Sequence, residues 1–291
     1  MHNIKLIIRQ ILIFSIISLL ITSCSTKIPD TTFNEIVENN ESIELISPTQ
    51  TIEIIDQQSL SIPTQINTVT SSVLINRIQS PLSEISIEEL TLIISRYFIL
   101  PIDGHDDGHH GIDLSFYQYK KWKSIDNHPV MSIVPGKVAG VIDDRFPYGN
   151  TIIIETSLGN ISTHILNNIS IPDRFPLYTP ASALNCPEKL AGYDPGEQDR
   201  SLYILYAHLK SNPSYAIGDL VEEEDIIGYV GTTGFSKIPH LHLEIRVGPS
   251  NVSFGSIAEY INDVTPEEVN NYCLWRVSGV FKLIDPMKVL K

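Results

Sequence analysis

The segment Pro239-His240-Leu241-His242-Leu243-Glu244-Ile245-Arg246 decides how the chain folds. Apolar residues alternate with polar ones along it, so the segment is predicted to be a β-strand with one buried face and one face for chemistry. Because side chains in a strand repeat every two residues, His240 and His242 project from the same side. One of them can bind a metal while the other serves a reaction there. A histidine pair on a solvated sheet face has the same signature, so the pattern needs partners elsewhere in the chain.

The chain has 291 residues, enough for one good-sized domain with an appendage or for two small domains. Its hydrophobic content of 42% is ample for a core, and its formal net charge is −14. An acidic surface does not suit nucleic acid, because binding there depends on neutralising phosphates. No nucleic-acid partner is therefore expected.

The first residues have the pattern of an export signal. Lys5 and Arg9 precede an apolar run, Ile11 to Ile21, which is too short to span a bilayer as a helix. The sequence Leu-Ile-Thr-Ser-Cys that ends at Cys24 resembles a bacterial lipobox, where the cysteine is lipidated and cleavage occurs just before it. We therefore expect a lipoprotein-type signal peptide over residues 1–23, a membrane anchor through a lipid on Cys24 and an extracytoplasmic location. Ordinary secretion and an uncleaved anchor are the alternatives.

Composition divides the rest of the chain in two. Residues 24–80 are rich in Ser, Thr, Asn, Gln and Glu, which predicts a low-complexity acidic stalk. Residues 81–291 form the predicted folded domain, where short β-rich runs alternate with turns and no long amphipathic helix separates them. Such short connections favour an antiparallel sheet, so the predicted fold is mainly β. The predicted strands are 130–134, 136–142, 151–155, 202–208, 226–230 and 240–247.

Helices and insertions complete the predicted domain. The sequence from Ser86 to Glu89 is that of a capping box, and apolar residues at helical spacing after it predict a short N-terminal helix. Residues 157–200 and 252–278, the latter with a predicted helix over 266–272, are interpreted as insertions on the outside of the sheet. Outside the cytoplasm Cys186 and Cys273 can form a disulfide, but their spacing does not determine whether they pair.

Two further sequence motifs contain residues of the types that bind metals. The stretch from His105 to Asp113 combines histidines and carboxylates with glycines, which let a backbone turn back sharply so that both types of side chain reach one ion. A polar loop is the alternative. The sequence Tyr-Ala-His-Leu, with His208 at its third position, ends an apolar strand, where a lone histidine is more often structural.

Together the three groups resemble the lysostaphin-type, or LytM-like, zinc metalloendopeptidases, which are peptidoglycan hydrolases. The resemblance covers roughly Pro101 to Arg246, and its motifs appear in order: H-x-x-x-D from His109 to Asp113, then Y-A-H-L, then H-x-H from His240 to His242. Connecting pieces match as well, among them Tyr148-Gly149-Asn150. The resemblance implies the family's antiparallel β-sheet domain of the duplicated-hybrid-motif type.

The resemblance also implies one zinc ion held by His109, Asp113 and His242, with His208 and His240 acting on the reaction. Three protein ligands leave a fourth position for water, as in catalytic rather than structural zinc sites. The implied reaction is hydrolysis of peptide bonds in bacterial peptidoglycan, in stem-peptide cross-links or in cross-bridges. Which histidine takes the proton and which steadies the oxyanion stays open. A non-catalytic wall-binding or hydrolase-regulating module on the same scaffold is the alternative.

Neighbouring residues have competing interpretations. The register of the family motif selects His109 over His110 as the ligand. Residues 105–107 are interpreted as a solvated loop, with a second ion site as the alternative. Glu244 shares a strand face with the histidines and is either their partner or ordinary surface.

Overall fold

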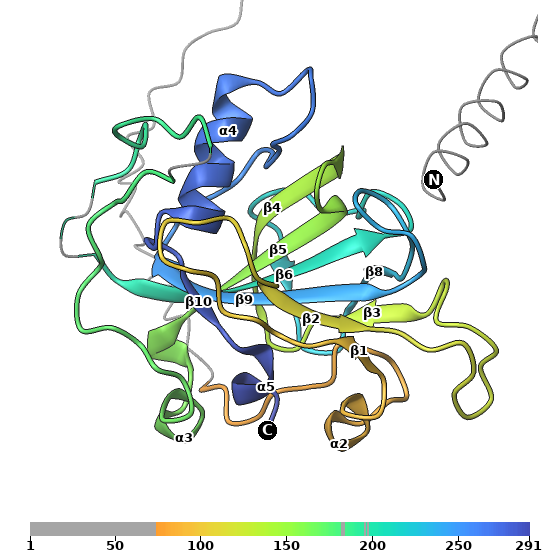
Figure 1. The fold of residues 1–291 in the computed structure, drawn as a ribbon. Helices are drawn as coiled ribbons and strands as arrows, with labels where there is room; N and C mark the ends of the chain where they lie inside the picture. Colours follow the sequence, from red (N-terminus) through yellow and green to blue (C-terminus); the bar gives the residue numbers. More distant parts are fainter. Residues whose placement is uncertain (1–73, 182–183, 195, 197) are drawn as a thin grey trace, which may run out of the picture. The chain divides into compact units, whose positions relative to one another are not determined.

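A computed structural model describes residues 74–181, 184–194, 196 and 198–291 (Figure 1). The predicted signal peptide, Cys24 and the stalk as far as residue 73 lie outside the described residues. The last residues of the predicted stalk lie against the domain, since Ile75 bridges to Ile161 and the backbone N–H of Gln79 donates to the carbonyl of Ile133 at 2.9 Å. Within the described ranges, none of the helices has the length and apolar character needed to cross a bilayer.

Short strands make up most of the regular structure, and the prediction of a mainly β fold is confirmed. The elements are α2 (Ile87–Leu90), β1 (Ile94–Arg96), β2 (Gly111–Leu114), β3 (Pro129–Met131), β4 (Gly136–Arg145), β5 (Gly149–Ser157), a 3₁₀ turn (Leu158–Asn160), α3 (Thr163–Leu166), β6 (Arg200–Leu209), β7 (Leu220–Val221), β8 (Ile226–Tyr229), β9 (Leu241–Pro249), α4 (Pro266–Tyr272), a π-helical turn (Cys273–Val277), β10 (Lys282–Ile284) and α5 (Pro286–Val289).

One antiparallel sheet organises the domain. Its strand order is β1-β2-β9-β6-β5-β4-β7, with β10 also paired to β9, while β3 and β8 form a separate pair. Strand β9 contains Leu241 to Arg246 of the alternating segment and lies between β2 and β6. The register places Asp113 of β2 and Ala207 of β6 on either side of His242. Residues from three distant parts of the chain therefore meet at the start of β9.

Both predicted helices form. The first, α2, is very short, whereas α4 has the predicted length. The capping box before α2 is present, and the backbone N–H of Ser86 donates to Glu89 at 2.9 Å. This helix is one turn long because β-branched residues follow it and the chain continues as β1, where Ile94 pairs with β2. The second helix, α4, has the predicted bounds and begins at a capping box on Thr265.

One face of the sheet is apolar. Leu241, Leu243 and Ile245 of β9 are fully buried there, together with Ile204 of β6 and Ile112 of β2. Helices α2, α3 and α5 lie on this side, below the sheet in Figure 1. The predicted alternation of β9 is thus real, and its apolar half forms the main core.

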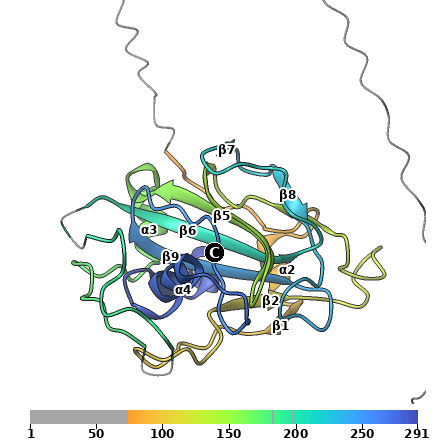
Figure 2. The ribbon, with the colours of Figure 1, turned by 90° about the horizontal axis from the view of Figure 1, so that it is seen from above.

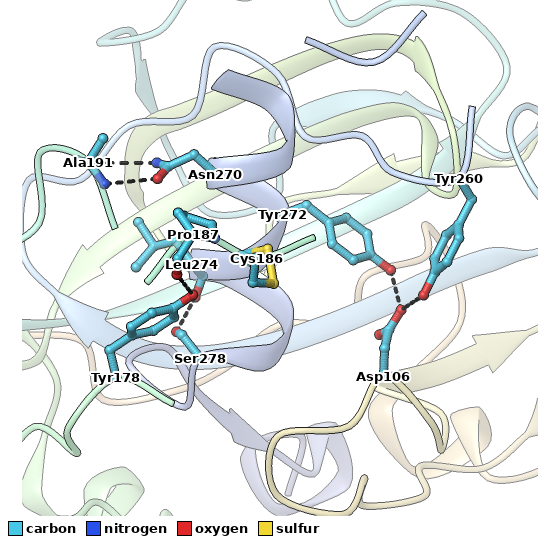
Figure 3. The surroundings of a disulfide bond; sticks show 11 residues. Asp106, Tyr178, Cys186, Pro187, Ala191, Tyr260, Asn270, Tyr272, Leu274 and Ser278 are labelled. Atoms are coloured by element: carbon cyan, nitrogen blue, oxygen red, sulfur yellow. Dashed lines mark hydrogen bonds between the residues drawn. A yellow bond between two sulfur atoms is a disulfide. The ribbon is translucent and has the colours of Figure 1, made fainter. Parts of the chain in front are cut away.

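The opposite face is covered by the two segments interpreted as outer insertions. Apolar residues of residues 252–278, chiefly Phe254 and Trp275, pack against Tyr203 of β6 and form a second core. Helix α4 and the π-helical turn lie over this face (Figures 1 and 2). A disulfide between Cys186 and Cys273 joins the two segments (Figure 3). The sequence did not predict this core, because its apolar residues are scattered among polar ones without a period.

Candidate metal centre

Three predicted ligands converge at the start of β9. The Oδ1 atom of Asp113 lies 3.1 Å from Nε2 of His109 and 2.9 Å from Nδ1 of His242, and the two nitrogen atoms are 3.2 Å apart. All three side chains are buried. Neighbouring strands β2 and β9 supply Asp113 and His242, and His109 comes from the segment that leads into β2.

The remaining ring nitrogen of each histidine predicted to be a ligand points to an acceptor. Nδ1 of His109 lies 2.8 Å from the carbonyl oxygen of Tyr97, and Nε2 of His242 lies 3.4 Å from Oε2 of Glu244. When this nitrogen carries the proton and donates it outward, the other ring nitrogen, which faces the cluster, has a free lone pair. Two imidazoles and one carboxylate with inward lone pairs form a donor set that suits zinc. The residues present therefore fit the ion that the resemblance implies.

Gly111 provides the space for this arrangement. Instead of turning the chain back, as the sequence predicted, it lies in extended strand β2. A Cβ atom at this position would lie 2.2 Å from the carbonyl oxygen of Leu243 and 2.9 Å from Cε1 of His242. The glycine is required because the ring of His242 and the β9 backbone approach β2 so closely.

His208 and His240 lie beside the cluster. Their ring centroids are 4.6 Å apart, and Nε2 of His240 is 3.6 Å from Oδ1 of Asp113. Nδ1 of His208 is 2.8 Å from the carbonyl of Thr233, and Nδ1 of His240 is 2.9 Å from that of Ile238. With Nδ1 donating to these carbonyls, both rings keep Nε2 free to accept a proton.

The backbone of His208 is held in an uncommon conformation. Its φ of 59° lies in the left-handed region, although the residue is not glycine. Its N–H donates to the carbonyl of Tyr148 at 2.9 Å, and its carbonyl accepts from Gly231 at 3.0 Å. Such conformations cost roughly 1–3 kcal/mol and persist only where the surroundings impose them. Two strand ends thus fix the direction of this side chain.

The surroundings shift the pKa values of the histidines in opposite directions. Burial, and then the neighbouring His242 and His240, lower the pKa of His208 to about 3, and burial also lowers the pKa of His240. Although burial opposes it, hydrogen bonds to Asp113 and Glu244 raise the pKa of His242 to about 9. Positive charge is therefore favoured at His242 and disfavoured at the other two rings. A bound cation would take the place of the His242 proton.

Glu244 is a partner of the site rather than surface. It is completely buried, and its Oε1 atom accepts from Nε of Arg246. Burial opposes the ionised form, but Arg246 and the hydrogen bond from His242 hold the pKa of the carboxyl well below its usual range. The sequence left this residue undecided because alternation defines a face but not what covers it.

The competing residues of the first motif point elsewhere. Nδ1 of His110 lies 2.7 Å from Nη2 of Arg246, and Nε2 lies 3.1 Å from the carbonyl of Asp107, so this ring does not join the cluster. The interpretation of a solvated loop is wrong for Asp106, which pairs with Arg276 and accepts hydrogen bonds from two tyrosines. No local pattern marks this pair, because its members lie 170 positions apart.

The fold and the site together define a protein with a buried His-Asp-His centre on an antiparallel sheet. Residues 196–254 match the model of peptidase family M23, which confirms the resemblance to these metallopeptidases. The matched segment carries His208, His240 and His242. His109 and Asp113 lie outside it and are joined to it by the pairing of β2 with β9.

Solved structures of this class show distant similarity to the chain. The catalytic domain of the antimicrobial peptidase lysostaphin from Staphylococcus simulans is 21% identical over 71% of this chain and 98% of that one, with a TM-score of 0.34. The catalytic domain of the prophage-encoded M23 protein EnpA from Enterococcus faecalis is 22% identical over 55% and 84%, with a TM-score of 0.31. A zinc-containing peptidase from Vibrio cholerae is 19% identical over 60% and 35%, with a TM-score of 0.27. A comparison with curated proteins gave no match.

Proposed function

We propose that the chain is a zinc-dependent endopeptidase that hydrolyses peptide bonds of bacterial cell-wall peptidoglycan, in stem-peptide cross-links or in cross-bridges. The observation that carries the proposal is the convergence of His109, Asp113 and His242 with two further histidines, His208 and His240, directly beside them. A cluster built only for structure would have no use for two additional imidazoles with free nitrogen atoms. The family match supports a peptidase, and the predicted export signal supports a substrate outside the cytoplasm.

The chain's own residues account for the movement of protons. His109, Asp113 and His242 would hold one zinc ion, which when bound would supply a Lewis acid for the scissile carbonyl and lower the pKa of water. His208 and His240 are neutral at neutral pH, because burial lowers the pKa of both. One of them accepts the proton of the attacking water through Nε2 and returns it to the leaving amine. The other ring lies within the same site, and it can steady the oxyanion of the tetrahedral intermediate only when Nε2 carries a proton, because that contact requires an N–H donor.

Cleavage of wall fragments tests the proposal. The purified full chain, loaded with zinc and incubated with muropeptides, should release products with new amino termini. Cleavage should stop with a chelator, return with added zinc, and be lost in His240→Ala. Absence of cleavage of every wall preparation at full zinc occupancy would contradict the proposal. It would favour the alternative, a non-catalytic wall-binding or hydrolase-regulating module on the same scaffold.

The proposed location is extracytoplasmic, on a membrane, through a lipid on Cys24. Lys5, Arg9 and the apolar run before the lipobox-like sequence support it. Labelled fatty acid should be incorporated into the wild-type chain expressed in a bacterial host but not into Cys24→Ala. Equal labelling of the two proteins would overturn the anchor.

A further inference from the structure

Glu244 connects the metal cluster to the second face of the sheet. Its Oε2 atom faces Nε2 of His242 at 3.4 Å and accepts a hydrogen bond from the hydroxyl of Tyr148 at 2.8 Å. His242 and Tyr148 are both buried, as is Glu244. The position of this carboxylate therefore determines the tautomer and the ring orientation of a predicted ligand.

Arg276 from the 252–278 segment supports Tyr148. Its Nη1 atom donates to the hydroxyl oxygen of Tyr148 at 3.1 Å, and its guanidinium group lies 5.9 Å from the centroid of that ring. The donors are thus aligned in one direction: the arginine donates to the phenol, and the phenol donates to Glu244. A cationic donor strengthens the phenol as a donor in turn.

The same arginine also holds the loop that carries His109. Nε of Arg276 pairs with Oδ1 of Asp106, three residues before His109, and the side chain of Asp106 is only 6% exposed. The hydroxyl groups of Tyr272 and Tyr260 donate to Oδ2 of Asp106 at 2.6 and 2.7 Å (Figure 3). Without the arginine, this buried carboxylate would lose its cation, and the loop would move to hydrate it.

The π-helical turn explains why these contacts come from one place. It carries Cys273, Trp275 and Arg276 in close succession, and the disulfide on Cys273 ties the turn to the other insertion. Trp275 lies beneath the guanidinium group of Arg246, with 5.2 Å between the guanidinium carbon and the ring centroid. Arg246 pairs with the other oxygen of Glu244. Both oxygen atoms of Glu244 are therefore supported from this turn.

We propose that Arg276 is a positioning residue for the metal site, acting on His242 through Tyr148 and Glu244 and on His109 through Asp106. The 252–278 segment is then part of the apparatus that sets zinc affinity, in addition to covering the sheet. This inference rests on the proposed zinc site and deepens it, because it assigns the site a support that the predicted motifs do not contain.

Zinc affinity tests the inference without measuring activity. Competition with a chromophoric chelator gives the zinc Kd of the full chain and of its variants. We expect Arg276→Ala to bind zinc roughly 10–100-fold more weakly, the range found when the outer partners of metal ligands are removed. Tyr148→Phe, which removes only the hydroxyl group, should weaken binding by about 10-fold. Arg276→Lys should recover part of the loss, because it restores the charge beside Asp106 but cannot also donate to Tyr148.

Arg145→Ala is the matched control. Arg145 holds the same segment through Glu268, with Nε and Nη2 at 2.7 and 2.9 Å from the carboxylate oxygens, and within the described part of the chain its side-chain hydrogen bonds go to Glu268 and Asp263, away from Glu244. Its loss should lower the melting temperature while leaving the zinc Kd within a factor of about two.

The outcomes separate this inference from the proposed function. Zinc affinities of Arg276→Ala and Tyr148→Phe equal to that of Arg145→Ala overturn the inference alone. A wild-type chain that binds no zinc overturns the proposed function and, with it, this inference. If Arg276→Ala does not fold, Tyr148→Phe and Arg276→Lys decide, since both keep the bulk of the side chain.

Discussion

The two faces of β9 are both buried, but the residues that cover them are of different kinds. On one face Leu241, Leu243 and Ile245 pack into a core formed by the sheet and by helices α2, α3 and α5. On the other, His242, Glu244 and Arg246 are also buried but polar, and besides one another they contact Tyr148 and Trp275, which lie far away in the sequence. The apolar face needs only neighbours of suitable size, whereas each buried polar group needs a partner at a defined position. The 252–278 segment supplies two of these supports: Trp275 lies against Arg246, and Arg276 donates to Tyr148, the partner of Glu244.

The largest expected effect is on the polar face near the start of β9, where His240 and His242 lie. His242→Ala should weaken zinc binding by more than about 100-fold, because removal of the outer partners of a ligand alone costs 10–100-fold. His240→Ala should keep zinc and lower the rate of peptide cleavage about 10²–10⁴-fold, as expected for a lost proton-transfer group. The measurements are zinc content after dialysis and single-turnover cleavage of muropeptides. Loss of zinc from the His240 variant would overturn the division between metal and reaction.

The apolar face should respond through stability instead. Ile204 is fully buried and lies opposite Ile245 in the sheet register. Ile204→Ala should lower the free energy of unfolding by about 2–5 kcal/mol, because it leaves a cavity in a packed core. Urea denaturation of the metal-free protein measures this loss, and the zinc Kd of the folded variant should stay that of the wild type. A loss below about 1 kcal/mol would show that this face is loosely packed.

The covalent link across the polar face should have a similar or smaller effect. The disulfide spans 87 residues, so its loss frees a long loop in the unfolded chain. Replacing Cys186 and Cys273 by serine should cost about 2–4 kcal/mol of stability. Thermal unfolding of the wild type with and without reductant provides the comparison. Identical melting temperatures would indicate that packing alone holds the two insertions together.

The smallest effect is expected at the rim, where Arg145 pairs with Glu268. Burial opposes ionisation, but hydrogen bonds from Arg145 and the Thr265 backbone lower the pKa of Glu268 to about 2. A carboxyl with a lowered folded pKa stabilises the protein above its ordinary pKa of about 4.5, and this contribution disappears as the pH falls toward 2. At pH 7 the free energy of unfolding of the wild type should exceed that of Glu268→Gln by about 1 kcal/mol. The difference should shrink between pH 4.5 and pH 3, and a constant difference would contradict this account.

Much of the fold could be predicted because it depends on local pattern. Alternation along residues 240–247 predicted β9, and the run at residues 202–208 predicted β6. The capping box on Thr265 marked the start of α4. These features need only a few neighbouring residues to be recognised, and the structure shows each of them.

The members of the candidate site could be named from motifs, but their supports could not. The spacing from His109 to Asp113 and from His240 to His242 carries a recognisable signature. The pairing of Asp106 with Arg276 and the carbonyl of Tyr97 behind His109 depend on long-range packing and leave no local trace. Gly111 also depends on long-range packing, because it lacks a Cβ atom where the ring of His242 approaches β2, and it does not turn the chain. Sequence patterns thus identify the groups that act more readily than those that hold them.

The position of the disulfide has a consequence for damage to the chain. His208, His240 and His242 all lie within the loop that Cys186 and Cys273 close. A single proteolytic cut anywhere inside that loop leaves the two pieces covalently joined. A nicked protein would run as one band on a gel without reductant and as two bands after reduction. In surroundings that contain proteases, an accidental cut between the two cysteines would not release either half of the chain.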